Sequence, residues 1–181
     1  MNEPSLPEKV VAIHERLGDA RIAHAFGGAL ALAYYAEPRA TIDVDVNVFV
    51  DPSDHPAVAR ALVPLGVTVD AGVTAERDGQ CRWSWGRTPI DIFFAYDEFH
   101  EAMRAAARTV PFGATTITVL APEHLVVCKA LFDRPKDWLD IEQVLVCADE
   151  LDIAEVDRWL THTVDEHDER RRRFAQLAAA N

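Results

Sequence analysis

Residues 41–50 show the clearest alternation of apolar and polar positions in the chain and predict a strand. Valines occupy every second position there, and Asp43, Asp45 and Asn47 lie between them. Successive side chains of a strand point to opposite faces, so we expect the valines to face the core and the three polar residues to share the other face. Two carboxylates this close repel each other unless a cation lies between them.

The rest of the pattern predicts helices and strands in mixed order, followed by helices alone. Apolar positions near helical period indicate helices over residues 5–18, 27–35, 54–64 and 97–107. Runs rich in β-branched and aromatic residues predict strands over residues 67–71, 80–85, 89–95 and 115–120, the last as an edge strand. From Pro122 the pattern is helical to the end, and residues 152–155 form a capping box. We therefore expect an α+β core over residues 1–120 and a helical region over residues 121–181.

Composition narrows the class of protein further. The formal net charge of −12 argues against a general nucleic-acid coat protein, because phosphate backbones attract basic surfaces. RNA binding through a local basic patch stays open. The cysteines are scattered without metal-ligand spacing, and the chain shows neither a signal-peptide pattern nor a membrane-length apolar run. We therefore expect a cytoplasmic protein with reduced thiols and no membrane partner.

A glycine pair, Gly27-Gly28, opens the second predicted helix. Glycine lets backbone N–H groups approach a phosphate at a helix N-terminus without a Cβ clash. A tight turn with no ligand is the alternative interpretation of the pair.

Two further charged residues, Asp91 and Lys129, stand inside apolar stretches. A charge in such a position loses hydration unless it has a partner. Three acids around two divalent cations would form a phosphoryl-transfer centre, whereas a structural ion pair is the alternative for Asp91. Lys129 is either a point charge for a triphosphate or a snorkelling surface lysine. Asp137 and Asp140 lie on one helix face and can pair with this lysine or with neighbouring cations.

These motifs carry a family resemblance. The glycine pair followed by Asp43-x-Asp45 on a strand resembles the signature of the DNA polymerase β-type nucleotidyltransferase superfamily. Residues 122–141, which contain Lys129 and an Arg-Pro-Lys-Asp sequence, resemble the AbiEii-type toxins within it, including the mycobacterial MenT toxins. Two departures are a slightly long separation of Gly28 from Asp43 and a glycine at position 28, where the superfamily often has serine.

The resemblance implies a nucleotidyltransferase-fold mixed sheet flanked by helices, with a C-terminal helical region. It also implies two Mg²⁺ ions and an NTP whose α-phosphorus is attacked in line, with pyrophosphate leaving. Asp43, Asp45 and Asp91 would hold the metals. The residues implied around the nucleotide are Gly27, Gly28, Arg39, Thr41, Lys129, Asp137 and Asp140.

Several acceptors are compatible with this reaction. The AbiEii-type resemblance implies NMP transfer to the 3′ end of tRNA, which blocks aminoacylation and growth, and a cognate antitoxin as partner. The alternatives are transfer to a protein hydroxyl (AMPylation), transfer to an aminoglycoside or lincosamide antibiotic, and an inactive binding module. A tRNA acceptor predicts a basic patch beside the acids, drawn from Arg77, Arg82, Arg87, Arg134 and Lys136. An antibiotic acceptor predicts an acidic, aromatic-lined pocket, for which Trp83 and Trp85 are candidates.

Overall fold

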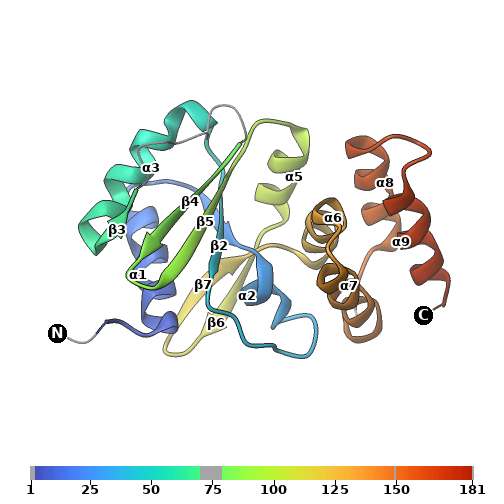
Figure 1. Ribbon diagram of the computed structural model, residues 1–181, viewed down its shortest axis with the longest axis horizontal. Helices are drawn as coiled ribbons and strands as arrows, with labels where there is room; N and C mark the ends of the chain where they lie inside the picture. The colour runs from blue at the N-terminus through green and yellow to red at the C-terminus, as the bar shows by residue number, and fades with distance from the viewer. Residues whose placement is uncertain (1–2, 70–78, 149, 181) are drawn as a thin grey trace.

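A seven-stranded mixed sheet forms the centre of the computed structural model, which describes residues 3–69, 79–148 and 150–180 (Figure 1). The strands follow the order β3-β4-β5-β2-β1-β7-β6 across the sheet. β2 pairs in parallel with β5 and antiparallel with β1, and β1 pairs in parallel with β7. The strands are β1 (His24–Phe26), β2 (Val44–Val48), β3 (Val67–Thr68), β4 (Gln80–Trp85), β5 (Thr88–Phe94), β6 (Arg108–Phe112) and β7 (Thr115–Val119).

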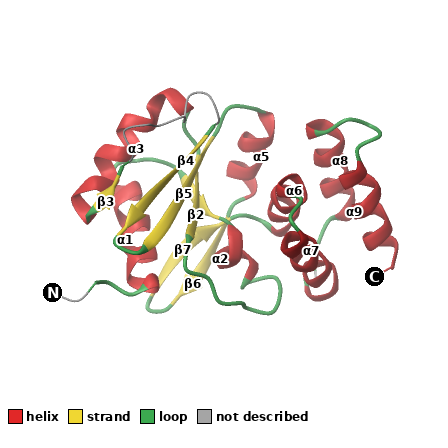
Figure 2. Ribbon diagram, viewed as in Figure 1, coloured by secondary structure: helices red, strands yellow, loops and turns green. Residues whose placement is uncertain are grey.

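Helices cover both faces of this sheet (Figure 2). α1 and α3 lie on one side, and α2 and α6 lie on the other, with α7, α8 and α9 stacked beyond α6. The helices are α1 (Leu6–Asp19), α2 (Gly28–Leu32), α3 (His55–Leu62), α5 (Glu98–Ala106), α6 (Pro122–Phe132), α7 (Pro135–Cys147), α8 (Ile153–Thr163) and α9 (Glu169–Ala180). The expected mixed sheet flanked by helices, with helices alone after residue 121, is confirmed.

β2 shows why the sheet has one apolar and one polar face. Val44, Val46 and Val48 are at most 1% exposed and belong to the hydrophobic core. Asp45 and Asn47 alternate with them and line a cavity on the opposite face. The strand is shorter than the sequence predicts, because only residues 44–48 pair with the neighbouring strands as a regular ladder.

The expectation of an edge strand at residues 115–120 is wrong. β7 lies between β1 and β6, and its inward residues Ile117 and Val119 are fully buried. The strand at this edge of the sheet is β6, which the sequence pattern did not predict. Pro111 sits in β6 and lacks an N–H group for a further neighbour, which suits a strand at the edge of a sheet.

The C-terminal helices begin as expected with α6 at Pro122. Asp152 is the N-cap of α8 and accepts a hydrogen bond from the Glu155 backbone N–H, as predicted, but the box is not closed because the Asp152 N–H donates to Glu123 Oε1 instead of Glu155. Across the described ranges, the structure has no helix with both the length and the apolarity needed to span a membrane. The division of the chain at residue 120 stays a prediction.

Candidate active site

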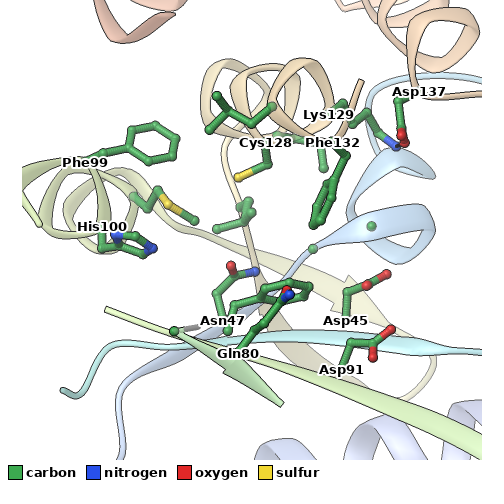
Figure 3. Close-up of a pocket in the computed structure, with 18 of the residues that line it drawn as sticks. Asp45, Asn47, Gln80, Asp91, Phe99, His100, Cys128, Lys129, Phe132 and Asp137 are labelled. Carbon is green, nitrogen blue, oxygen red and sulfur yellow. Dashed lines mark ion pairs between the residues drawn. The ribbon is translucent and has the colours of Figure 1, made fainter. Parts of the chain in front are cut away.

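A cavity of about 810 Å³ lies between the polar face of the sheet and the helices α2, α5 and α6 (Figure 3). This volume falls in the range of small-molecule sites in proteins. Lys129, Asp45 and Asp91 lie toward one end, and Phe99 and His100 lie at the other. The predicted residues Gly27, Gly28, Arg39, Asp43, Asp45, Asp91, Lys129 and Asp137 all line it.

The three predicted acids meet at one end of this cavity. Asp45 and Asp91 are direct partners in the parallel register of β2 and β5, so their carboxylates lie side by side on the same face (Figure 3). Asp43 immediately precedes β2. Burial, together with the negative charges of Asp43 and Asp91, raises the pKa of Asp45 to about 6. The cluster therefore favours a positive partner.

Two of the acids already have partners in the protein. The Arg82 guanidinium donates from Nε to Asp91 Oδ1 and from a terminal nitrogen to Asp91 Oδ2, both at 2.6 Å. The Thr41 hydroxyl donates to Asp43 Oδ1. Burial opposes ionisation of Asp43, but the Thr41 bond and the charges of Lys136 and Arg82 hold its pKa below the usual value.

A divalent cation fits the chemistry of this donor set but not its present arrangement. Carboxylate oxygens are the ligands that Mg²⁺ prefers, and a cation would offset the repulsion that raises the Asp45 pKa. Among the described residues, however, no three acidic, histidine or cysteine side chains are arranged as a ready metal site. Asp91 would have to exchange its Arg82 partner for the metal.

The glycine pair lies against the acids, but its two members differ. Gly28 adopts a left-handed backbone with φ of 53°, and a Cβ at this position would overlap Asp45 Oδ2. The Gly27 N–H donates to the Asp45 carbonyl at 3.0 Å, so this amide is already used. The prediction that both glycines present N–H groups to a triphosphate is corrected accordingly. Gly27 instead provides space, since its Cβ would lie 2.9 Å from Asn47 Nδ2.

Lys129 is a buried member of an ion-pair network rather than a snorkelling surface lysine. Its side chain is 4% exposed, and its Nζ lies 2.6 Å from Asp140 Oδ2 and 3.9 Å from Asp137 Oδ1. Asp140 also accepts two hydrogen bonds from Arg39, at 3.1 and 3.0 Å. Although burial opposes its ionisation, the bonds from Arg39 and Lys129 hold the Asp140 pKa below its usual value. Asp137 and Asp140 thus hold cations at the cavity, with Asp137 also pairing with Arg134.

Aromatic and amide side chains also line the cavity, and the sequence pattern did not single them out as functional. The group comprises Gln80, Phe93, Tyr96, Phe99, His100 and Phe132. Their spacing from the charged residues could have indicated two of them. Phe93 lies two residues from Asp91 on one strand, and Phe132 lies three residues from Lys129 on one helix, so each shares a face with a predicted site residue. The tryptophans proposed for this role, Trp83 and Trp85, do not line the cavity.

The basic residues expected as an RNA patch separate into three groups. Arg82, Arg134 and Lys136 line the cavity, but both arginines are held by aspartates. Arg87 does not line it and pairs with Glu3. Arg77 lies outside the described residues. Within the described residues, five aspartates and five lysines or arginines line the cavity, so its formal charge is balanced.

No protein-family model and no curated protein matches this chain. Solved structures do match it in fold. The solution structure of the antibiotic-resistance factor ANT(2'')-Ia has a TM-score of 0.65 at 15% identity, with 99% of this chain and 98% of that chain covered. The lincosamide antibiotic adenylyltransferase LnuA, in a lincomycin-bound crystal structure, has a TM-score of 0.55 at 10% identity, with 79% and 98% covered. An antigenic nucleotidyltransferase-like protein from Paracoccidioides brasiliensis has a TM-score of 0.54 at 18% identity, with 97% and 93% covered. The chain therefore has the fold of these nucleotidyltransferase structures over 79% to 99% of its length.

Proposed function

We propose that this protein is a metal-dependent nucleotidyltransferase that moves a nucleoside monophosphate from an NTP to an acceptor hydroxyl. The observation that carries the proposal is the register pairing of Asp45 with Asp91 inside a cavity. Gly28 lies against Asp45, and Lys129 lines the same cavity. Four separate segments thus bring acids, a glycine turn and a buried lysine together at one site. If each residue had only a structural role, the four segments would have no need to meet.

Each of these residues has a part in the proposed reaction. Asp43, Asp45 and Asp91 would hold two Mg²⁺ ions, which when bound stabilise charge on the phosphates and lower the pKa of the attacking hydroxyl. The Gly28 N–H and the Lys129 ammonium would bind the triphosphate. Lys129 remains fixed in one position by Asp140, which pre-organises its charge. The protein thus contributes mainly positioning and electrostatic stabilisation for in-line attack on the α-phosphorus.

We propose a small hydroxylated molecule of the aminoglycoside or lincosamide kind as the acceptor. The cavity is concave and lined by aromatic rings, as such an acceptor predicts, but its five aspartates are matched by five lysines or arginines and give no acidic excess. A solved structure of ANT(2'')-Ia that contains adenylyl-2''-tobramycin covers 94% of this chain at a TM-score of 0.64. The likeness supports the proposal, although at 13% identity it concerns the fold.

The 3′ end of tRNA is the second candidate acceptor, with a cognate antitoxin as the partner that restrains the activity. It is favoured by the basic side chains at the cavity, of which Lys136 has no ion-pair partner among the described residues. The balanced charge of the cavity and the overall charge of −12 weigh against it, because RNA backbones bind where basic residues are in excess.

A labelling experiment separates these acceptors. Purified protein is incubated with Mg²⁺, each of the four α-³²P-labelled NTPs, and in turn an aminoglycoside panel, lincomycin, total tRNA or a protein extract. We expect label in an antibiotic and not in tRNA. Label in tRNA alone would select the toxin candidate, and label in protein alone would select AMPylation.

A further inference from the structure

Two parallel rows of side chains cross the polar face of the sheet inside the cavity. The strand registers place Arg82, Asp91 and Asp45 side by side in the first row, which is charged. The second row lies two residues farther along the strands, roughly 7 Å away, and carries no charge. The lining of the cavity therefore changes from charged to neutral between these two adjacent rows.

The second row consists of an aromatic ring between two amides. Phe93 is the register partner of Gln80 on one side and of Asn47 on the other. Figure 3 shows Gln80 and Asn47 between the acidic end and His100. A carboxamide offers both a donor and an acceptor, so two of them can bind the edge of a polar ring. The Asn47 amide donates only one long bond, 3.4 Å to the Ala25 carbonyl, and within the described residues Gln80 makes no side-chain hydrogen bond.

Phe132 adds a second ring above this row. It is the last residue of α6, and its ring meets that of Phe93 edge to face, with centroids 5.8 Å apart and planes at 68°. The ring is 45% exposed although it lines the cavity. The guanidinium carbon of Arg134 lies 4.8 Å from its centroid. Two rings at this angle form an inside corner, in which a flat ligand can stack on one and contact the other by its edge.

We infer that Phe93 and Phe132, together with the amides of Gln80 and Asn47, form a pocket that binds and selects the nucleobase of the NTP. The inference rests on the proposed nucleotidyl transfer and adds which group occupies the neutral part of the cavity. A planar heteroaromatic ring matches an uncharged aromatic corner flanked by amides. A polycationic acceptor would instead require free carboxylates there, and the nearby Asp97 is already bound to His100 at 2.5 Å.

Binding measurements with and without a base test this assignment. Isothermal titration calorimetry with Mg²⁺ compares inorganic tripolyphosphate with the α,β-methylene analogues of ATP, GTP, CTP and UTP. The variants are Phe132→Ala and Gln80→Ala, and the controls are Leu139→Ala and Gln143→Ala on α7. Leu139 and Gln143 are exposed and do not line the cavity, so they report the effect of a surface truncation alone.

We expect Phe132→Ala to weaken binding of the nucleotide analogues about tenfold or more, as loss of one base-stacking contact does. Tripolyphosphate binding should stay within about twofold of the native protein. Gln80→Ala should change the order of preference among the four bases, and the control variants should change neither property. An equal loss for tripolyphosphate and nucleotides, or no loss for either, overturns the inference, as does a native protein that binds nucleotides no better than tripolyphosphate.

The outcomes also separate this inference from the proposed function. If transfer is observed but Phe132→Ala raises only the KM of the acceptor, the neutral part of the cavity belongs to the acceptor and the nucleobase assignment is wrong. If nucleotides bind with the expected dependence on Phe132 but no acceptor is modified, the nucleobase pocket stands and the proposed transfer fails.

Discussion

Arg82 and Asp91 face each other across adjacent strands and form two parallel hydrogen bonds of 2.6 Å. This bidentate pair occupies both oxygens of the acid that completes the proposed metal site. The arginine side chain is 68% exposed and the aspartate side chain 15%. Water can therefore solvate the guanidinium if it leaves the aspartate. Arg82 therefore competes with a cation for Asp91.

Removal of this competitor should ease metal binding. We expect Arg82→Gln to lower the Mg²⁺ concentration needed for half-maximal nucleotidyl transfer by several fold. The free energy of unfolding should change by less than about 1 kcal/mol, because exposed ion pairs contribute little. Metal titrations of transfer rate, with urea unfolding in parallel, measure both. A higher Mg²⁺ requirement in the variant would show that Arg82 assists the site.

Gly28 should be required for the position of Asp45 as well as for the turn. Gly28→Ala places a methyl group where Asp45 Oδ2 lies, on a backbone with φ of 53°. We expect transfer to fall below detection and the protein to lose about 1–2 kcal/mol of stability from the left-handed backbone.

Gly113→Ala is the matched control for this variant. Gly113 has a φ of 59°, and a Cβ there would have no heavy atom within 4 Å. It should lose a similar amount of stability in a urea titration and keep full transfer activity. Equal activity in the two alanine variants would remove the contact between Gly28 and Asp45 from the mechanism.

The buried pair of Lys129 and Asp140 should contribute differently to stability and to activity. Asp140→Asn leaves a lysine that is 4% exposed without its nearest anion, and we expect a loss on the order of 3 kcal/mol. The double variant Lys129→Met, Asp140→Leu removes both charges and should recover much of that stability in a urea titration. Transfer should remain absent in the double variant because the triphosphate has lost its cation. Recovery of transfer along with stability would assign the pair a structural role alone.

His124 should limit stability in mild acid. This residue of α6 is 2% exposed, and its ring lies near the rings of Phe99 and Trp159. Both ring nitrogens lack hydrogen-bond partners among the described residues. Burial lowers its pKa below 6.5. The unfolded chain then binds a proton that the folded protein resists, so stability falls as pH drops through about 6.5.

His124→Phe removes both the unpaired nitrogens and this proton uptake. We expect a gain of about 1–3 kcal/mol at pH 5 and a shallower fall of stability between pH 7 and pH 5. The exposed His167→Phe serves as control and should leave the pH profile of urea unfolding unchanged. An unchanged profile in His124→Phe would contradict the account of this residue.

The parts of the molecule that sequence reasoning could predict are those where one segment carries its own signal. The alternation in β2 placed Asp45 and Asn47 on one face, and Lys129 stood out as a charge in an apolar helix. β6 has no buried alternation because it lies at the edge, where all five of its residues are exposed or only partly buried. β7 resembled an edge strand because threonines occupy its exposed positions, and its burial depends on a neighbour that no local pattern indicates.

The pairings within the site depend on distant segments and were not predictable. Arg39 and Asp140 are 101 positions apart in the chain, and only the packing of α7 beside the loop after α2 brings them together. Phe93 and Phe132 resembled ordinary core residues, since an aromatic ring in a strand or helix has the same local pattern whether it lines a cavity or fills one. Charged residues in apolar runs revealed the ionic end of the cavity, whereas the neutral end could be recognised only from the fold.

Pyrophosphate release reports directly on the proposed transfer reaction. The native protein and Asp45→Asn are each mixed with Mg²⁺, the four NTPs and the full set of acceptors, and released pyrophosphate is measured together with label transfer. We expect equal amounts of pyrophosphate and labelled acceptor from the native protein and neither from Asp45→Asn, with both proteins folded by circular dichroism. Transfer by Asp45→Asn at the native rate, or no pyrophosphate from the native protein with any acceptor, would contradict this expectation.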